Sequence, residues 1–230
     1  MKIAVIGTGT VGRTFASRLS GLGHNVTVGT RDVAATLSRT QEARAGMPAF
    51  SVWQSEHPDV ALASFAEAGA QAEVIINATS GIATLDALEA VGARNLAGKV
   101  LIDIALPLDG LPGQPRSLVL ASTDSLGEQI QRTFPDARVV KTLNTVFVDV
   151  MVDPSRVPGP HNVFVSGDDA DAKAVVTELL VSMGHGDVID LGGLETARGA
   201  EMWLPLWVRL AVALGGSDFN IKIVRGPSLA

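Results

Sequence analysis

Two kinds of hydrophobic periodicity alternate along the chain. Short apolar runs bounded by glycine or charged residues predict buried strands, and apolar positions three and four residues apart predict the helices between them. Strands are expected at 3–6, 26–29, 73–78, 99–104 and 138–143. Helices are expected after the first strand and at 64–70, 84–91 and 125–134. A helical or irregular stretch is expected at 33–44 and a loop at 106–115. Strands that alternate with helices are typical of a parallel sheet covered on both faces. Residues 1–150 are therefore expected to form a doubly wound α/β domain.

Prolines cluster between residues 152 and 160 and predict a domain boundary there. Beyond it, the pattern predicts a strand at 162–166, a helix at 169–183, a strand at 187–191 and a long helix at 194–214. Residues 151–230 are thus expected to form a small C-terminal α+β domain.

The long C-terminal helix has apolar residues at helical spacing, which form one broad face of Trp203, Leu206, Trp207 and Leu210. We interpret this face as core or as the interface of a homodimer, because an apolar surface of this size is more than a small domain easily covers. A role in lining a substrate site is the alternative.

Glycines follow the first strand with the spacing GTGTVG, at Gly7, Gly9 and Gly12. The first glycine permits a tight turn, the second lets the backbone approach a pyrophosphate, and the third lets the following helix pack close to the strand. The phosphates would lie at the N-terminus of that helix, where free N–H groups and the helix dipole favour negative charge. Because the motif lies between a strand and a helix and is followed by a second strand, it predicts a dinucleotide-binding Rossmann domain rather than a structural turn.

The residues that close the second strand address the choice of dinucleotide. Sites that prefer NAD place an acidic residue there, which binds the ribose hydroxyls and repels a 2′-phosphate. This chain has Thr30 followed by Arg31, and a hydroxyl beside a guanidinium suits a phosphate dianion. Asp32 would serve as an acid of the NAD type if the strand were two residues longer. Because the strand is expected to end at Gly29, the sequence favours NADP.

Ligands of open parallel sheets bind beyond the carboxyl ends of the strands. Besides the glycine turn and Thr30–Arg31, the segments 77–81 and 143–146 are expected to meet at this edge. The small residues from Ala78 to Gly81 would let a cofactor lie against the backbone. Asn144 can donate and accept at the nicotinamide or at a second ligand, or alternatively cap its own loop. Asp103 and Asp109 flank the same edge, and such loop carboxylates are expected to be solvated.

Composition narrows the range of partners. The chain has 230 residues, a formal net charge of -6 and no cysteine. The negative charge argues against binding nucleic acid or an anionic membrane, and the lack of cysteine excludes thiolate metal sites and cysteine nucleophiles. The most apolar stretch, at 202–214, is too short for a membrane span. The residues of the first predicted strand begin at the N-terminus, where a signal peptide would lie. A cytoplasmic location is therefore expected. The four histidines lack metal-ligand spacing and are expected at the surface or in loops.

The segments GTGTVG, VGTRD, VVKTLNTV, VSGDDADAK and FNIKIV together resemble the NADPH-dependent coenzyme F420 reductases, small two-domain proteins that pass a hydride between a reduced deazaflavin and NADP. The resemblance covers essentially the whole chain. It implies nucleotide contacts at Thr8, Thr10 and Val11, phosphate contacts at Thr30 and Arg31, and nicotinamide contacts at Ala78, Thr79, Val146 and Val148. It further implies that a flat substrate, coenzyme F420, lies over the nicotinamide between the Asn144 loop and Phe219–Asn220.

The cytoplasmic reductase domains of membrane metalloreductases look similar as well, especially around LNTV. Two features depart from the F420 reductases: Phe147 replaces a proline in the loop after the strand at 138–143, and the segment Pro48–Pro58, with Trp53, is a longer insertion of unassigned role. The predicted function is therefore transfer of a hydride between NADP(H) and a flat redox cofactor, coenzyme F420 by the resemblance. The alternatives are a reductase of a flavin, quinone, ferric or small carbonyl acceptor, and an NADP-binding sensor without turnover.

Overall fold

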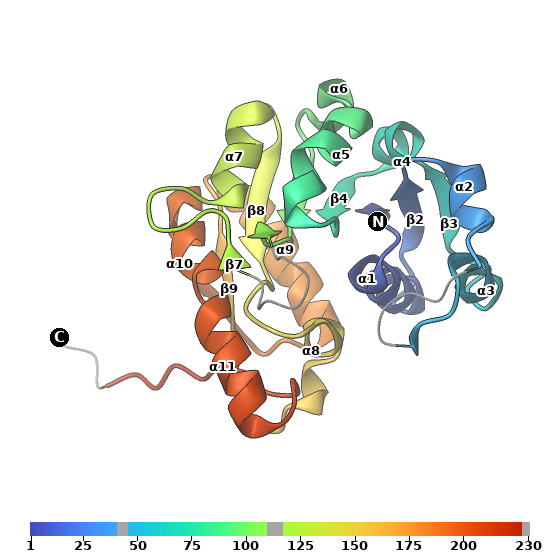
Figure 1. The fold of residues 1–230 in the computed structure, drawn as a ribbon. Helices are drawn as coiled ribbons and strands as arrows, with labels where there is room; N and C mark the ends of the chain where they lie inside the picture. The colour runs from blue at the N-terminus through green and yellow to red at the C-terminus, as the bar shows by residue number, and fades with distance from the viewer. Residues whose placement is uncertain (41–45, 110–116, 227–230) are drawn as a thin grey trace.

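The computed structural model describes residues 1–40, 46–109 and 117–226, and an eight-stranded sheet forms its centre (Figure 1). The strands are β1 (Lys2–Ile6), β2 (Asn25–Thr30), β3 (Ala61–Ser64), β4 (Val74–Asn77), β5 (Val100–Asp103), β8 (Arg138–Thr142), β9 (Asn162–Ser166) and β10 (Asp187–Asp190). Their spatial order is β10-β9-β8-β5-β4-β1-β2-β3, parallel from β8 to β3, whereas β9 pairs antiparallel with β8 and β10 runs parallel to β9. The strand order reverses between β1 and β4, and a ligand is expected at that point.

Helices cover both faces of this sheet. They are α1 (Thr10–Gly21), α2 (Val33–Leu37), α3 (Phe50–Ser55), α4 (Phe65–Gln71), α5 (Thr84–Val91), α6 (Ala93–Leu96), α7 (Leu126–Thr133), α8 (Val148–Val152), α9 (Ala170–Met183), α10 (Ala197–Glu201) and α11 (Leu204–Leu214). Alternate residues of β1 point to opposite layers, as the pleat requires. Ile3 and Val5 pack with residues of α1, α3, α8 and α9, while Ala4 and Ile6 pack with α4, α5, α7 and α10. The doubly wound α/β fold predicted from the sequence is confirmed.

The two halves of the sequence share this one sheet, because β9 and β10 continue it beyond residue 150. The division into domains 1–150 and 151–230 stays a prediction about folding units.

Among the described residues, the local predictions differ from the structure in several places. The expected helix at 194–214 is wrong, because a 3₁₀ turn (Leu194–Thr196), α10 and α11 replace it. Pro205 lies in the first turn of α11, where its missing N–H costs nothing, and it marks a new helix start. β3 and α3 were not expected, and a short hairpin of β6 (Leu108–Asp109) and β7 (Ser117–Leu118) begins in the expected loop. Residues 110–115 of that loop, and residues 41–44 of the expected stretch at 33–44, lie outside the described residues.

Candidate active site

The glycine turn joins β1 to α1 at the point where the strand order reverses. Gly7 has φ +128°, and a Cβ there would lie 2.6 Å from the carbonyl oxygen of Ala78. A Cβ at Gly12 would clash with the carbonyl oxygen of Gly7, so only glycine lets α1 start this close to β1. The turn therefore packs directly against the end of β4.

The N-terminus of α1 fits a pyrophosphate. Gly9 is its N-cap residue, and no side chain caps the helix. A Cβ at Gly9 would find no protein atom within 4 Å, which leaves an open cradle above the first N–H groups of the helix. These groups need a partner, and an anion at a helix N-terminus provides one.

The end of β2 shows how the predicted discriminating residues lie. The Thr30 side chain is buried, and its hydroxyl lies 2.7 Å from that of Thr36, whose own proton goes to the Asp32 carbonyl oxygen. The Thr30 proton is thereby used inside the protein. Arg31 is exposed, and the Asp32 carboxylate accepts from the Ala35 N–H as the N-cap of α2. No described residue forms an ion pair with Arg31, whereas the Asp32 carboxylate is occupied as a helix cap.

A cavity of about 500 Å³ extends from the glycine turn along the carboxyl ends of β4, β5 and β8. Its described lining is Thr10, Val11, Ala78, Thr79, Ser80, Gly81, Ile104, Ala105, Leu106, Leu108, Asn144, Val146, Phe147, Val148, Met151, Leu204 and Trp207. Seven residues proposed for the site from the sequence lie together here, namely Thr10, Val11, Ala78, Thr79, Asn144, Val146 and Val148. Thr8, Thr30, Arg31, Phe219 and Asn220 do not line it.

Three aromatic rings stack beside this cavity. The ring centroids of Phe147 and Trp207 are 6.2 Å apart with an interplanar angle of 11°, and those of Trp207 and Phe219 are 5.4 Å apart at 20°. Phe219 therefore lies behind Trp207. Asn220 donates to His161 Nδ1 at 2.8 Å and to the carbonyl oxygen of Asn162 at 3.0 Å, which places its amide against the start of β9. Of the broad apolar face expected in the C-terminal helix, Trp207 is the member that lines the cavity.

The loop after β8 holds Asn144 in place. Leu143 has φ +59°, a left-handed conformation that costs a residue with a Cβ about 1–2 kcal/mol. Asn144 Nδ2 donates to the Ala200 carbonyl oxygen at 2.8 Å, and the residue is 5% exposed. Its amide nitrogen thus ties the cavity wall to α10, and its Oδ1 remains for a ligand.

A buried ion cluster lies below the cavity. Lys141 Nζ is 2.8 Å from Asp103 Oδ2 and 2.9 Å from Glu201 Oε1, and all three side chains are essentially inaccessible. Burial lowers the pKa of Lys141, but the two carboxylates more than offset this, and the net direction is upward. The expectation that Asp103 is solvated is wrong, because β8 places a lysine directly beside it in register. Asp109 is exposed and accepts from Ser117, as a loop carboxylate does.

The unassigned insertion covers the first turn of α1. The Arg13 guanidinium is 5% exposed and donates to the carbonyl oxygens of Thr8 at 2.9 Å and Pro48 at 2.6 Å. It also lies 5.4 Å from the centroid of the Phe50 ring. Burial lowers the pKa of Arg13. The Pro48–Pro58 segment therefore clamps the glycine turn through Arg13, with Trp53 in the core.

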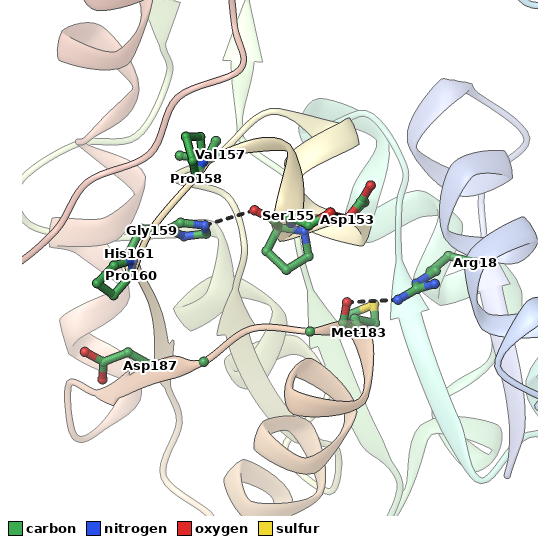
Figure 2. A pocket seen from close by; sticks show the side chains of 13 residues that line it. Arg18, Asp153, Ser155, Val157, Pro158, Gly159, Pro160, His161, Met183 and Asp187 are labelled. Atoms are coloured by element: carbon green, nitrogen blue, oxygen red, sulfur yellow. Dashed lines mark hydrogen bonds between the residues drawn. The ribbon is translucent and has the colours of Figure 1, made fainter.

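A second cavity, of about 650 Å³, lies between Arg18 and the segments 153–161 and 183–187 (Figure 2). Two of its polar side chains bond to backbone carbonyl oxygens: Arg18 donates to that of Met183 at 3.0 Å, and His161 Nε2 lies 3.1 Å from that of Pro154. Adjacent His185 is 2% exposed, contrary to the expectation of a surface or loop histidine, and burial lowers its pKa. This cavity shares no lining residue with the first.

Within the described part of the chain, no helix combines the length and apolarity that a membrane span requires, and no group of side chains is arranged to hold a metal ion.

Residues 2–107 match the family described as NADP oxidoreductase, coenzyme F420-dependent.

Three relatives of known description extend this match. The F420-dependent NADP reductase of Methanothermobacter marburgensis is 30% identical over 99% of this chain and 100% of its own length. A crystal structure from Arthrobacter sp. FB24, described as a candidate F420-dependent NADP reductase, is 61% identical, with a TM-score of 0.93 over 98% of this chain and 100% of that one. The rat metalloreductase STEAP3 is 31% identical over 93% of this chain but only 39% of its own length. The chain therefore belongs to the family of F420-dependent NADP reductases and is an oxidoreductase.

Proposed function

We propose that the protein transfers a hydride between NADP(H) and the deazaflavin coenzyme F420 in the cavity between the glycine turn and Trp207. One observation carries this proposal: the cavity begins at the open N-terminus of α1, ends at an aromatic wall, and has no ionisable side chain in its described lining. Reduction of a small carbonyl compound needs a proton donor beside the substrate. Hydride exchange between two rings needs mainly their alignment, at about 3.5 Å.

The nucleotide half of the site is built from the strand-end loops. The pyrophosphate would lie against Gly9 and the α1 N-terminus, and the 2′-phosphate would lie near Arg31. The nicotinamide would lie against Ala78 and Thr79, with Val146 and Val148 opposite. NADP, when bound, supplies or accepts the hydride, and these residues bind and orient it.

The substrate half is formed by Asn144, Phe147 and Trp207. The flat deazaflavin would lie over the nicotinamide, where aromatic neighbours contribute about 0.5–1.5 kcal/mol each beyond their buried area. Phe219 supports this wall from behind Trp207, and Asn220 fixes the segment that carries Phe219. Apolar residues such as Leu204 exclude water from the reacting rings. The proposal takes Phe219 and Asn220 as supporting residues of the substrate site.

The test is a stopped-flow measurement of NADP⁺ reduction by reduced F420, followed as NADPH formation, with flavin, quinone and ferric acceptors assayed in the NADPH-oxidising direction. Ala78→Leu places a larger side chain in the cavity and should abolish transfer. Ala34→Leu, on the exposed surface of α2, is the matched control and should react like the parent. Asn144→Ala should slow the reaction, because the cavity wall loses its bond to α10.

The proposal is supported if the parent and Ala34→Leu turn over with F420, Asn144→Ala does so more slowly and Ala78→Leu does not react. Turnover of the parent with a flavin, quinone or ferric acceptor in place of F420 would assign a different substrate to the same cavity. Binding of NADPH without turnover in any assay would indicate a sensor.

The proposal includes a cytoplasmic homodimer. None of the residues of α11 is buried, and Leu206, Val212 and Leu214 are 51%, 77% and 64% exposed. An exposed apolar surface of this kind marks an interaction site.

A further inference from the structure

One hydrogen-bond chain joins the loops that form the floor of the cofactor cavity. Lys141 pairs with Asp103 and also donates to the carbonyl oxygen of Ala105, which lines the cavity. Asp103 Oδ1 accepts from Asn77 Nδ2 at 2.8 Å, and Asn77 is fully buried at the end of β4. Asn77 Oδ1 lies 2.7 Å from the hydroxyl of Thr79, a cavity residue. The chain thus runs from a buried ammonium to the cavity wall.

The orientation of the Asn77 amide is fixed from both sides. The Asp103 carboxylate, paired with Lys141, can only accept, so the amide nitrogen must face it. The backbone N–H of Thr79 can only donate, and it lies 3.3 Å from the other end of the amide, which must be the oxygen. The two constraints agree, which is the criterion for assigning an amide.

This orientation decides what Thr79 offers to a ligand. The Thr79 hydroxyl lies 2.7 Å from Asn77 Oδ1, which can only accept, and 3.0 Å from the Thr84 hydroxyl, a contact in which either oxygen can donate. The Thr79 hydroxyl proton is used inside the protein in both arrangements. The backbone N–H of Thr79 is committed to Asn77 Oδ1. The side chain of Thr79 therefore presents only lone pairs to the cavity.

We propose that Asp103 and Asn77 act as a positioning relay that makes Thr79 a hydrogen-bond acceptor, and that this acceptor recognises the amide N–H of the nicotinamide carboxamide. The inference rests on the proposed function, since it requires the nicotinamide to lie against Thr79. Lys141 anchors the relay, and its contact with the Ala105 carbonyl oxygen ties β8 to the loop after β5. Thr79 touches the cofactor, whereas Asp103 and Asn77 act through it.

The substitution Asp103→Asn would disrupt the relay with almost no change in volume. The oxygen of the new amide must face Lys141, which only donates, so its nitrogen faces Asn77 Nδ2 and the Ala105 N–H, which are both donors. An Asn77 amide that turned its oxygen toward residue 103 would set its nitrogen against the Thr79 N–H, so neither orientation satisfies every group, and the Thr79 hydroxyl loses its fixed acceptor. Lys141 keeps Glu201 as a partner, so no unpaired charge remains.

The experiment compares the Kd of NADP⁺ with that of its 3-acetylpyridine analogue, in which a methyl group replaces the amide nitrogen. The parent should prefer NADP⁺ by about two- to tenfold, the contribution of one hydrogen bond. Thr79→Val should remove this preference and Thr79→Ser should keep it. Asp103→Asn should weaken or abolish the preference.

Asp190→Asn is the matched control. Asp190 ends β10, pairs with Lys173 at 2.9 Å and accepts from the N–H two residues onward, as Asp103 does, but it lies outside the cavity lining. Its substitution should leave the preference unchanged. If Asp103→Asn does not fold, the triple substitution of Asp103→Leu, Lys141→Met and Glu201→Gln replaces the buried ion cluster by uncharged groups, an exchange that proteins often tolerate, and should also lower the preference.

A parent without preference for NADP⁺ over the analogue, or a full preference retained in Thr79→Val or in the folded relay variants, would overturn the inference. A parent that binds neither nucleotide would overturn the proposed function as well, so the two failures are distinguishable.

Discussion

Gly9→Ser should separate the stability of the glycine turn from its function. The backbone of Gly9 is extended, with φ −75° and ψ −176°, and a Cβ would meet no protein atom within 4 Å. Serine fits this geometry without strain and is a slightly better N-cap than glycine, by a few tenths of a kcal/mol. The free energy of unfolding should therefore stay equal or rise by about 0.3 kcal/mol.

Nucleotide affinity should change in the opposite direction. The serine hydroxyl would accept from the N–H groups of the first turn of α1, and its Cβ would occupy the open cradle above them. One charge-assisted hydrogen bond to a phosphate is worth about 1.5–3 kcal/mol, so its loss weakens NADP⁺ binding by about ten- to 150-fold. A gain in stability with a loss of binding is the signature of a position that is left uncapped for a ligand.

Calorimetric titration with NADP⁺ and urea unfolding measure the two quantities on the same samples. Gly21→Ser, at the other end of α1 and equally open around its Cβ, is the control and should bind like the parent. Gly12→Ala should instead lose stability, because its Cβ would meet the Gly7 backbone, a clash that costs about 3 kcal/mol against about 1 kcal/mol gained in helix propensity. Unchanged NADP⁺ affinity in Gly9→Ser would refute a pyrophosphate at this helix N-terminus.

Three further outcomes are expected. Arg31→Ala should weaken NADPH by about ten- to 150-fold and leave NADH nearly unchanged in a fluorescence titration; equal losses would assign the preference to another residue. Val212→Lys with Leu214→Lys should convert a dimer to a monomer in light scattering, and a monomeric parent would contradict the proposed interface. Hydrogen bonds from Arg138 hold the pKa of Asp169 at about 2, below its unfolded value of about 3.9, so its contribution to stability is present above pH 4 and is lost as the pH falls toward 2. Asp169→Asn should flatten the stability curve in that window, measured by urea unfolding, and an unchanged slope would exclude this pair as its cause.

The glycine turn was predictable because its signals are local. Gly7, Gly9 and Gly12 lie close together in the sequence. Gly7 and Gly12 are required by close backbone contacts, and Gly9 leaves the helix N-terminus uncapped, as the structure shows. The strand that ends at Thr30 is almost continuously apolar or β-branched, so its end could be placed within one residue. Asp32, the competing residue, is recognisable as an N-cap only once the short helix α2 is known.

The elements that the sequence did not reveal lack such local signals. β3 reads ALAS, with no β-branched residue, and it forms a strand because β2 offers it an open edge. α3 is short and is held by burial of Phe50 and Trp53 rather than by caps. Tertiary packing decides both elements.

The position of Lys141 in the sequence indicates that it has a carboxylate partner but does not identify which one. A lysine inside the strand RVVKT, between buried valines and a buried threonine, requires a carboxylate, because an unpaired buried ammonium is prohibitively costly. The partner is Asp103, at the end of the neighbouring strand, but that identification needs the β5–β8 pairing, which no local pattern supplies. Glu201 comes from farther still, through α10.

The two halves of the cavity therefore depend on different kinds of information, and this bears on substrate specificity. In the proposed site, the pyrophosphate end of the nucleotide half is the glycine turn, whose residues are close in sequence. The substrate half combines Asn144 and Phe147 with Trp207, about sixty residues away along the chain and brought close by α10 and α11. Family membership constrains the first half strongly, because the glycine turn admits few alternatives. The second half is set by how α11 lies on the loop after β8, so a substitution at Trp207 can change the acceptor while the nucleotide contacts stay as they are. A change in acceptor among relatives should thus be sought in α11 and the Phe147 loop.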